Sequence, residues 1–397
     1  MKLCFISQAF FTKSGSSYYS NPALVKLLEM IAPLYDEVEL CVPVSDRPTP
    51  RNYSKLSIAN VKLCPLPPYW RRFELHAFRH PLMLMRCLWP HIKRGDTILM
   101  NLPNYMCVLA WLICLLQRKR FVIRMGGNWP EVMRMTFYNY GMVALGNIAA
   151  FLHRLLVKAM VKTSSLTIVN GQELADIFGR KNPHLVRVIS STYHESDIAS
   201  TIAGSKSNEC RLLYAGVLKL NKGLFELFRA AKDLLEEGLE LRIWLAADGS
   251  RRKEIRTEAE ELGIIDRVDF LGWIAIEKLK YIYRACDIFV LPSYTEGMPK
   301  VVPEAMSNGL ATVVTDVGGL RDVIVQDGKT GFVVPIKDVP ALRDALRKLI
   351  VDKTLRQRMA EAGLERSRQF TMESERACVK AALQKFGFLP DSSERGN

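Results

Sequence analysis

The chain has 397 residues, 49% of them hydrophobic and 24% charged, which predicts a globular protein of two domains, each large enough for its own core. Its net charge of +14 indicates anionic partners, but no nucleic-acid-binding motif accompanies the charge, so we expect no nucleic acid. The nine cysteines form no CxxC pair and no metal-ligand spacing, which indicates reduced thiols in a cytoplasmic protein.

The first half of the chain alternates short apolar runs with helical patterns. Residues 2–6 (KLCFI) read as a strand, and a strand at this point is not the apolar region of a signal peptide. A Gly/Ser loop over 12–19, whose only glycine is Gly15, precedes a predicted helix at 22–31. Further strands are predicted at 38–42, 97–100, 121–125 and 166–169.

Two basic stretches of this half carry many apolar side chains. Residues 69–94 interleave Trp, Phe and Leu with Arg, Lys and His, and residues 151–162 form a basic amphipathic helix. Such segments can lie in a membrane interface, or they can pack on their own domain. The apolar run at 105–116 has 12 residues, fewer than the roughly 20 of a spanning helix, so we expect a buried helix.

The sequence RMGGNW, which begins at Arg124, follows one of the predicted strands. Its two glycines favour a tight turn at the strand end. Arg124 or Asn128 could reach from this turn into a binding cleft, or the turn could be purely structural.

The second half repeats strand and helix at regular spacing, which predicts a parallel sheet covered by helices on both faces. The predicted strands are 211–215, 241–247, 268–271 and 287–291, and the helices are 224–237, 251–262, 277–286, 300–308 and 373–386. A polar stretch at 194–208 separates the halves. We therefore expect one domain at 1–194, a second at 209–370, and a C-terminal helix and tail at 371–397.

Two loops of the second half carry candidate binding residues. In the first, Gly216 and Gly223 permit close backbone approach, and Lys222 brings a cation to a helix entrance, as a diphosphate requires. In the second, Glu296 precedes a Gly297-Met298-Pro299 turn, with Pro299 expected in the first helical turn, and Glu304 follows early on the helix. The alternatives are an ordinary turn with an exposed lysine, and surface carboxylates that cap a helix.

The run from Asp287 to Pro335, with its EGMP and TDVGG turns, resembles the donor-binding core of the retaining, nucleotide-sugar-dependent glycosyltransferases of family 4, the group 1 glycosyl transferases. The resemblance implies an α/β GT-B fold, with two Rossmann-like domains facing each other across a cleft and a C-terminal helix that crosses back to the first domain. The first domain would bind the acceptor and the second a nucleotide sugar. No metal or other cofactor is expected, and the chain has no Asp-x-Asp motif that could hold one on the diphosphate.

The resemblance also implies roles for single residues. Glu304 would hold the ribose, Glu296 the donor sugar, and Lys222 the departing diphosphate. Gly15, Gly216, Gly272, Gly297 and Met298 would line the donor site. Arg124 and Asn128 occupy the region where many members have a histidine near the donor sugar. The sequence departs from the family's Gly-Arg-x4-Lys-Gly loop at Val217, which stands in place of the arginine.

The resemblance therefore implies a retaining enzyme that transfers a hexose-type sugar from a nucleoside diphosphate sugar to a sugar or lipid-linked acceptor hydroxyl, in cell-surface polysaccharide or glycolipid synthesis. The expected location is the cytoplasm, with peripheral contact at the inner face of an anionic membrane. A catalytically weak protein of the same fold, acting as a binding partner or nucleotide-sugar sensor, is the alternative that Val217 favours.

Overall fold

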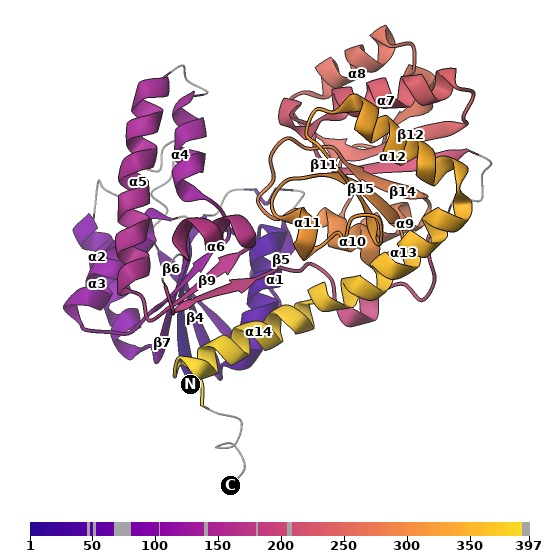
Figure 1. Cartoon of the computed structure of the whole chain (residues 1–397). Coiled ribbons are helices and arrows are strands. Elements are labelled where there is room, and N and C mark those ends of the chain that lie inside the picture. The colour runs from indigo at the N-terminus through magenta and orange to yellow at the C-terminus, as the bar shows by residue number, and fades with distance from the viewer. Residues whose placement is uncertain are drawn as a thin grey trace. The chain divides into compact units, whose positions relative to one another are not determined.

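The computed structural model describes residues 1–45, 48–50, 53–66, 81–102, 104–138, 142–179, 182–204 and 209–390 (Figure 1). The chain forms two compact units. Unit 1 comprises Met1–Ile189 and Glu375–Asn397, and unit 2 comprises Ser190–Ser374. The first part of the basic stretch predicted at 69–94, up to residue 80, lies outside the described residues.

Unit 1 is built on a parallel sheet in the strand order β10-β9-β8-β7-β1-β4-β6. The parallel strands are β1 (Lys2–Ile6), β4 (Glu37–Ser45), β6 (Val61–Leu66), β7 (Thr97–Leu102), β8 (Val122–Met125), β9 (Leu166–Asn170) and β10 (Leu185–Val188). The order reverses between β1 and β7, because β1 pairs with β4 on one side and β7 on the other. Parallel strands are buried on both faces, which explains runs such as KLCFI.

The helices of unit 1 follow local sequence signals closely. The described helices are α1 (Pro22–Ile31), α2 (Pro81–Arg94), α3 (Tyr105–Leu116), α4 (Trp129–Tyr138), α5 (Val143–Thr163) and α6 (Gln172–Phe178). Asn21 caps α1 by accepting a hydrogen bond from the Ala23 backbone N–H, and Pro22 occupies the first helical position. Asn104 caps α3 in the same way. The helix predicted at 22–31 is therefore confirmed to the residue. The helix at 105–116 has the predicted bounds, but it is only partly buried, because Leu112, Leu115 and Leu116 near its end are exposed.

The segment around Gly15 differs from the prediction. Instead of a plain loop over 12–19, strands β2 (Phe11–Ser14) and β3 (Ser17–Ser20) form an antiparallel hairpin, joined to the main sheet by β2 and extended by β5 (Ser54–Lys55). Gly15 occupies the turn at φ +58°, a conformation that favours glycine. The glycine signal located the turn, but Tyr18 and Tyr19 extend the flanking residues into strands.

Unit 2 contains six parallel strands in the order β13-β12-β11-β14-β15-β16. They are β11 (Cys210–Val217), β12 (Leu241–Asp248), β13 (Val268–Phe270), β14 (Ile288–Leu291), β15 (Ala311–Thr315) and β16 (Gly331–Val334). Numbered from the first strand of the unit, this order is 3-2-1-4-5-6, the Rossmann arrangement. The predicted parallel sheet is confirmed.

Helices alternate with these strands. They are α7 (Leu224–Glu236), α8 (Arg252–Glu261), α9 (Ile276–Arg284), α10 (Val301–Ser307), α11 (Leu320–Val323), α12 (Val339–Val351) and α13 (Lys353–Ser367). The helix predicted at 300–308 begins one residue later, so Pro299 lies before α10 and not in its first turn.

The last helix, α14 (Met372–Lys385), begins in unit 2 and returns to unit 1. The Arg376 guanidinium donates to the carbonyls of Glu29 and Met30 at the end of α1, both at 3.0 Å. The structure places the boundary between the units at Ile189–Ser190, whereas the polarity of 194–208 predicted it a few residues later. Ala199 and Ala203 donate backbone hydrogen bonds to Ser307 and Gly309, which attaches this segment to unit 2 despite its polar composition.

Candidate functional site

The strand order of unit 2 determines where its candidate residues meet. β11 pairs with β12 on one side and with β14 on the other, so the connections after β11 and β14 leave the sheet in opposite directions. In open α/β sheets a crevice forms at this reversal, outside the carboxyl ends of the strands, and ligands bind there. The loop with Lys222 follows β11, and the loop with Glu296 follows β14.

Lys222 and Glu296 contact each other at this reversal. The Lys222 Nζ lies 2.6 Å from the Glu296 Oε1. Their side chains are only 16% and 15% exposed, so this ion pair is sheltered from solvent. The sequence predicts both residues in the donor site but not their pairing, because 74 positions separate them. The alternative of an exposed lysine in an ordinary turn does not fit this burial.

Gly223 allows the two loops to approach. It has φ +66° and precedes α7, and a Cβ at this position would lie 1.9 Å from the carbonyl oxygen of Pro292. Any side chain here would force the loop after β11 away from the end of β14. The expected close backbone approach is therefore present at Gly223. The backbone N–H of Tyr294 also donates to the Asn221 carbonyl at 2.9 Å.

A second glycine supports the turn that holds Glu296. Gly318, in the TDVGG sequence, has φ +61°, and a Cβ there would lie 2.5 Å from the Gly297 carbonyl oxygen. Gly297 itself faces open space, with no atom within 4 Å of its Cβ position, whereas Met298 is buried. The two glycine-bearing turns thus pack backbone against backbone, and the Gly297 side of the turn is accessible.

Glu304 lies in the first turn of α10 and accepts two hydrogen bonds. Its Oε2 accepts from the Tyr283 hydroxyl at 3.1 Å, and its Oε1 accepts from the Thr192 hydroxyl. Burial raises the pKa of Glu304 above its ordinary value, against these two hydrogen bonds, which lower it. The sequence did not predict Thr192 and Tyr283 as partners of Glu304, because they come from separate segments and belong to no motif. A fixed, half-buried carboxylate is unlike a surface helix cap, and it can still accept further hydrogen bonds from a diol.

The remaining predicted donor residues lie at ends of the neighbouring strands. Gly216 is near the end of β11, where a Cβ would lie 2.9 Å from the Tyr214 hydroxyl oxygen. Val217 ends the strand with its side chain 49% exposed, so an arginine would have room at this position. Gly272 follows β13 at φ +73°.

The predicted residues of unit 1 divide between the interior and the sheet edge. The Arg124 side chain is buried, with its Nη2 3.4 Å from Glu375 Oε1 of α14 and its Nη1 3.4 Å from Asn101 Oδ1. Of the two alternatives for Arg124, this position favours the structural one, because its charge is neutralised within unit 1. Asn128 lies beyond the end of β8 and donates to Glu173 at 3.0 Å. Gly15 is at the hairpin turn, with nothing within 4 Å of its Cβ position.

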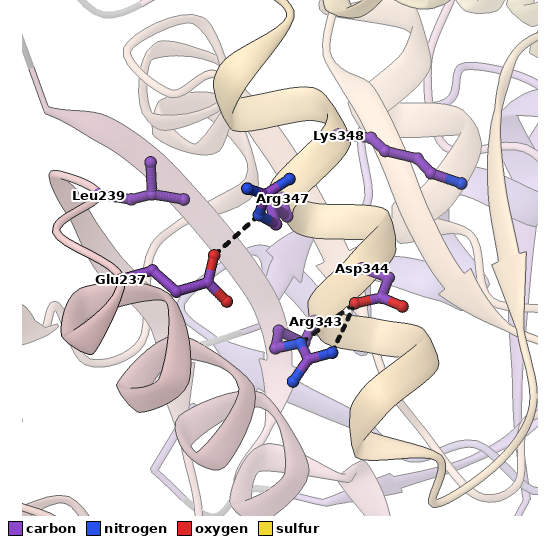
Figure 2. Close-up of a pocket in the computed structure, with 6 residues that line it drawn as sticks. All are labelled: Glu237, Leu239, Arg343, Asp344, Arg347 and Lys348. Carbon is purple, nitrogen blue, oxygen red and sulfur yellow. Dashed lines mark hydrogen bonds and ion pairs between the residues drawn. The ribbon is translucent and has the colours of Figure 1, made fainter.

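A surface hollow of unit 2 lies elsewhere. It has a volume of about 680 Å³ and is lined by Glu237, Leu239, Arg343, Asp344, Arg347 and Lys348 (Figure 2). Glu237 and Leu239 precede β12, at the amino edge of the sheet, opposite the loops of Lys222 and Glu296. Two of its three cations are paired, Arg347 with Glu237 at 2.8 Å and Arg343 with Asp344 at 2.9 Å (Figure 2). We therefore do not assign it to the donor.

One cluster of possible metal ligands occurs among the described residues. Cys41, Cys64 and His91 of unit 1 offer ligand atoms within 4.8 Å of one another, and His91 Nδ1 lies 2.7 Å from Glu39 Oε2. Sulfur and imidazole ligands suit zinc. The cluster belongs to unit 1 and includes none of the predicted donor residues, so it does not alter the expectation of a metal-independent donor site.

Comparisons with known proteins agree with this geometry. Residues 196–366 match the family described as Glycosyl transferases group 1. The D-inositol 3-phosphate glycosyltransferase of Corynebacterium urealyticum is 30% identical over 264 residues, 61% of each chain. The chain spans less than two thirds of the length of the first curated relatives it matches. The predicted family resemblance is confirmed.

Solved structures match nearly the whole chain. Sucrose-phosphate synthase from Thermosynechococcus elongatus superposes with a TM-score of 0.72 at 18% identity and covers 98% of this chain and 99% of its own. Anabaena HepE, solved with UDP and glucose, gives 0.69 at 19% identity, over 97% of this chain and 100% of its own. These similarities confirm the predicted GT-B fold.

Proposed function

We propose that this chain, whose residues 196–366 match the group 1 glycosyl transferases, transfers a hexose-type sugar from a nucleoside diphosphate sugar to an acceptor hydroxyl. The observation that carries the proposal is the meeting of Lys222 and Glu296 at the strand-order reversal of unit 2. At the carboxyl edge of the sheet, the Lys222 cation can bind the diphosphate of such a donor, and the Glu296 carboxylate can accept hydrogen bonds from its sugar hydroxyls. The solved complex of Anabaena HepE with UDP-glucose supports this class of donor.

In the proposed reaction each residue acts on one part of the donor. Glu304 accepts hydrogen bonds from the ribose hydroxyls while Thr192 and Tyr283 hold its carboxylate in place. Glu296 and the accessible backbone at Gly297 bind the sugar. Lys222 stabilises the negative charge that grows on the diphosphate as the glycosidic bond breaks, and a sheltered site strengthens this interaction.

The stereochemical course follows from the family resemblance. The acceptor oxygen bonds to the anomeric carbon on the face that the diphosphate leaves, and the acceptor proton passes to the departing diphosphate oxygen. The configuration is then retained. Acceptors of cell-surface polysaccharide or glycolipid synthesis, at the cytoplasmic face of a membrane, fit this proposal.

The alternative is a protein of the same fold that binds nucleotide sugars with little turnover. Val217 favours it, because this exposed side chain replaces the arginine of the family's loop and supplies no charge to a diphosphate.

The test begins with a panel of nucleotide sugars, from which the donor is identified as the one that raises the melting temperature most. The purified protein is then incubated with this donor, with and without candidate acceptor sugars and lipid-linked sugars, and release of free nucleoside diphosphate is measured. We expect release that Lys222→Met reduces by more than about 100-fold, the scale of losing one charge-stabilising group. The matched control, Lys232→Met, removes an α7 lysine that pairs with Glu236 at 3.7 Å, and should retain activity. Binding without release would establish the alternative.

A further inference from the structure

One apolar face of α5 is exposed, although the apolar side of a helix usually packs against the core. Five apolar residues, each at least half exposed, recur along this helix: Leu145, Ile148, Phe151, Leu152 and Leu155. At about 100° per residue they occupy an arc of about 120°. We call this set the α5 stripe. The buried residues of the helix, Gly146, Val157, Met160 and Val161, lie on another side.

Cations border the α5 stripe. Arg154, Lys158 and Lys162 are exposed and follow one another at i, i+4 and i+8, and none has an ion-pair partner among the described residues. The C-terminal end of α3 lies beside this end of α5, since the Trp111 Nε1 donates to the Thr163 hydroxyl at 2.8 Å. There α3 exposes Leu112, Leu115 and Leu116, before the basic sequence at 118–120.

Helix α2, which packs on α3, has the same character. It exposes Leu82, Met83 and Trp89, and these residues with Arg86 line an apolar hollow of about 930 Å³. The sequences of α2, α3 and α5 contain no Asp or Glu. Helices α2 and α5 therefore combine exposed apolar side chains with positive charge alone, and α3 carries no charge before the basic sequence at 118–120.

We propose that the α5 stripe, with the adjoining ends of α3 and α2, docks unit 1 onto an anionic lipid surface. Apolar side chains would enter the boundary between headgroups and acyl chains, and the cations would contact the headgroups. Charge complementarity selects this occupant over a second copy of the chain, because α2, α3 and α5 of a second copy would offer no Asp or Glu to pair with Arg154, Lys158 and Lys162. The inference stands on unit 1 alone and does not rest on the proposed glycosyl transfer.

The contacts of α5 favour an interfacial position over a spanning one. Among the described residues, α5 is the one helix long and apolar enough to cross a membrane by length and composition. It is, however, attached to neighbouring helices along its length (Figure 1). A Cβ at Gly146 would lie 2.9 Å from the Arg134 carbonyl oxygen of α4, and His153 Nε2 lies 2.6 Å from the Tyr105 hydroxyl oxygen of α3. These contacts leave only one side of α5 for lipid.

The experiment is cosedimentation of the full chain with vesicles of phosphatidylcholine, with or without phosphatidylglycerol, at low and high salt. We expect binding only to the anionic vesicles, weakened by salt. Replacing Arg154, Lys158 and Lys162 by Gln should weaken binding about 100-fold at low salt, since each cation near such a surface strengthens binding about fivefold. The matched control replaces Lys253, Lys278 and Lys329, exposed lysines of unit 2, by Gln and loses the same net charge, but should bind as before.

A second variant tests insertion of the α5 stripe. The double variant Phe151→Ser, Leu152→Ser replaces two exposed apolar side chains, so it should fold normally. It should abolish the part of the vesicle binding that persists at high salt. If the α5 variant (Arg154, Lys158 and Lys162 to Gln) and the unit 2 control lose vesicle binding equally, the proposal is overturned, because the attraction would then depend on net charge and not on α5. If the chain does not bind anionic vesicles, and light scattering shows a dimer that the double variant Phe151→Ser, Leu152→Ser dissociates, then the α5 stripe is covered by a second copy of the chain and the proposal is wrong. Binding that resists both salt and alkaline carbonate would indicate a spanning α5 and would also overturn the docking proposal.

Discussion

Removal of the Glu296 charge should tighten the binding of free nucleoside diphosphate. In the structure the Lys222 ammonium is held by Glu296 at 2.6 Å, so a diphosphate must compete with this carboxylate for the cation. The sequence alone predicts no such competition, and on that basis affinity for the diphosphate would be unchanged. Glu296→Gln keeps the shape of the side chain but releases Lys222.

The expected magnitude follows from the burial of the pair. Exposed ion pairs contribute about 0.2–1 kcal/mol, and hydrogen bonds to charged groups about 1.5–3 kcal/mol. With both side chains about 15% exposed, we expect a value between these ranges, about 1.4 kcal/mol, which is a tenfold gain in affinity. Turnover of the nucleotide sugar should fall in the same variant, because Glu296 is assigned to the sugar.

Calorimetry on four proteins measures this coupling: the parent chain, Glu296→Gln, Lys222→Met and the double variant. Lys222→Met should weaken diphosphate binding, and Glu296→Gln should then bring no further gain, because there is no cation left to release. An unchanged or weaker affinity in Glu296→Gln would refute the competition. A gain of equal size in the Lys222→Met background would show that the carboxylate repels the ligand directly, without the ion pair.

Three further predictions test the loops and the ribose carboxylate. Burial raises the pKa of Glu304, so nucleoside binding to its ionised form should weaken as pH falls through that raised pKa. Folding stability should show the opposite trend, because the contribution of Glu304 to the free energy of unfolding falls as pH rises through the same range. Glu304→Gln should remove both pH dependences, measured as nucleoside affinity and as melting temperature. Gly223→Ala should lower the free energy of unfolding by more than about 2 kcal/mol, since the added Cβ would collide with the Pro292 carbonyl, whereas Gly238→Ala, at φ +82° in open space, should cost only the backbone strain of about 1–2 kcal/mol. Val217→Arg should leave the melting temperature of the free protein unchanged and tighten diphosphate binding, and unchanged affinity would mean that this position does not face the phosphates.

Local signals in the sequence determined the elements of this protein and located the candidate loops. Asn21 and Pro22 define the start of α1, and Asn104 defines that of α3, because caps act on the backbone of the next few residues. The loops of Lys222 and Glu296 are recognisable because glycine and proline end strands wherever they occur. Strand and helix alternation was enough to predict parallel sheets, because parallel strands require crossover connections.

Only the tertiary structure decided which of these residues meet. Lys222 contacts Glu296 because β11 pairs with β14, and no local property of either loop specifies that pairing. Thr192 reaches Glu304 from 112 positions away, and Arg124 is neutralised by Glu375 from 251 positions away, although its own neighbours suggested an open turn. The periodicity of α5 predicts an amphipathic helix, but periodicity cannot say which face is covered. That depends on the neighbouring helices, which here leave the α5 stripe exposed.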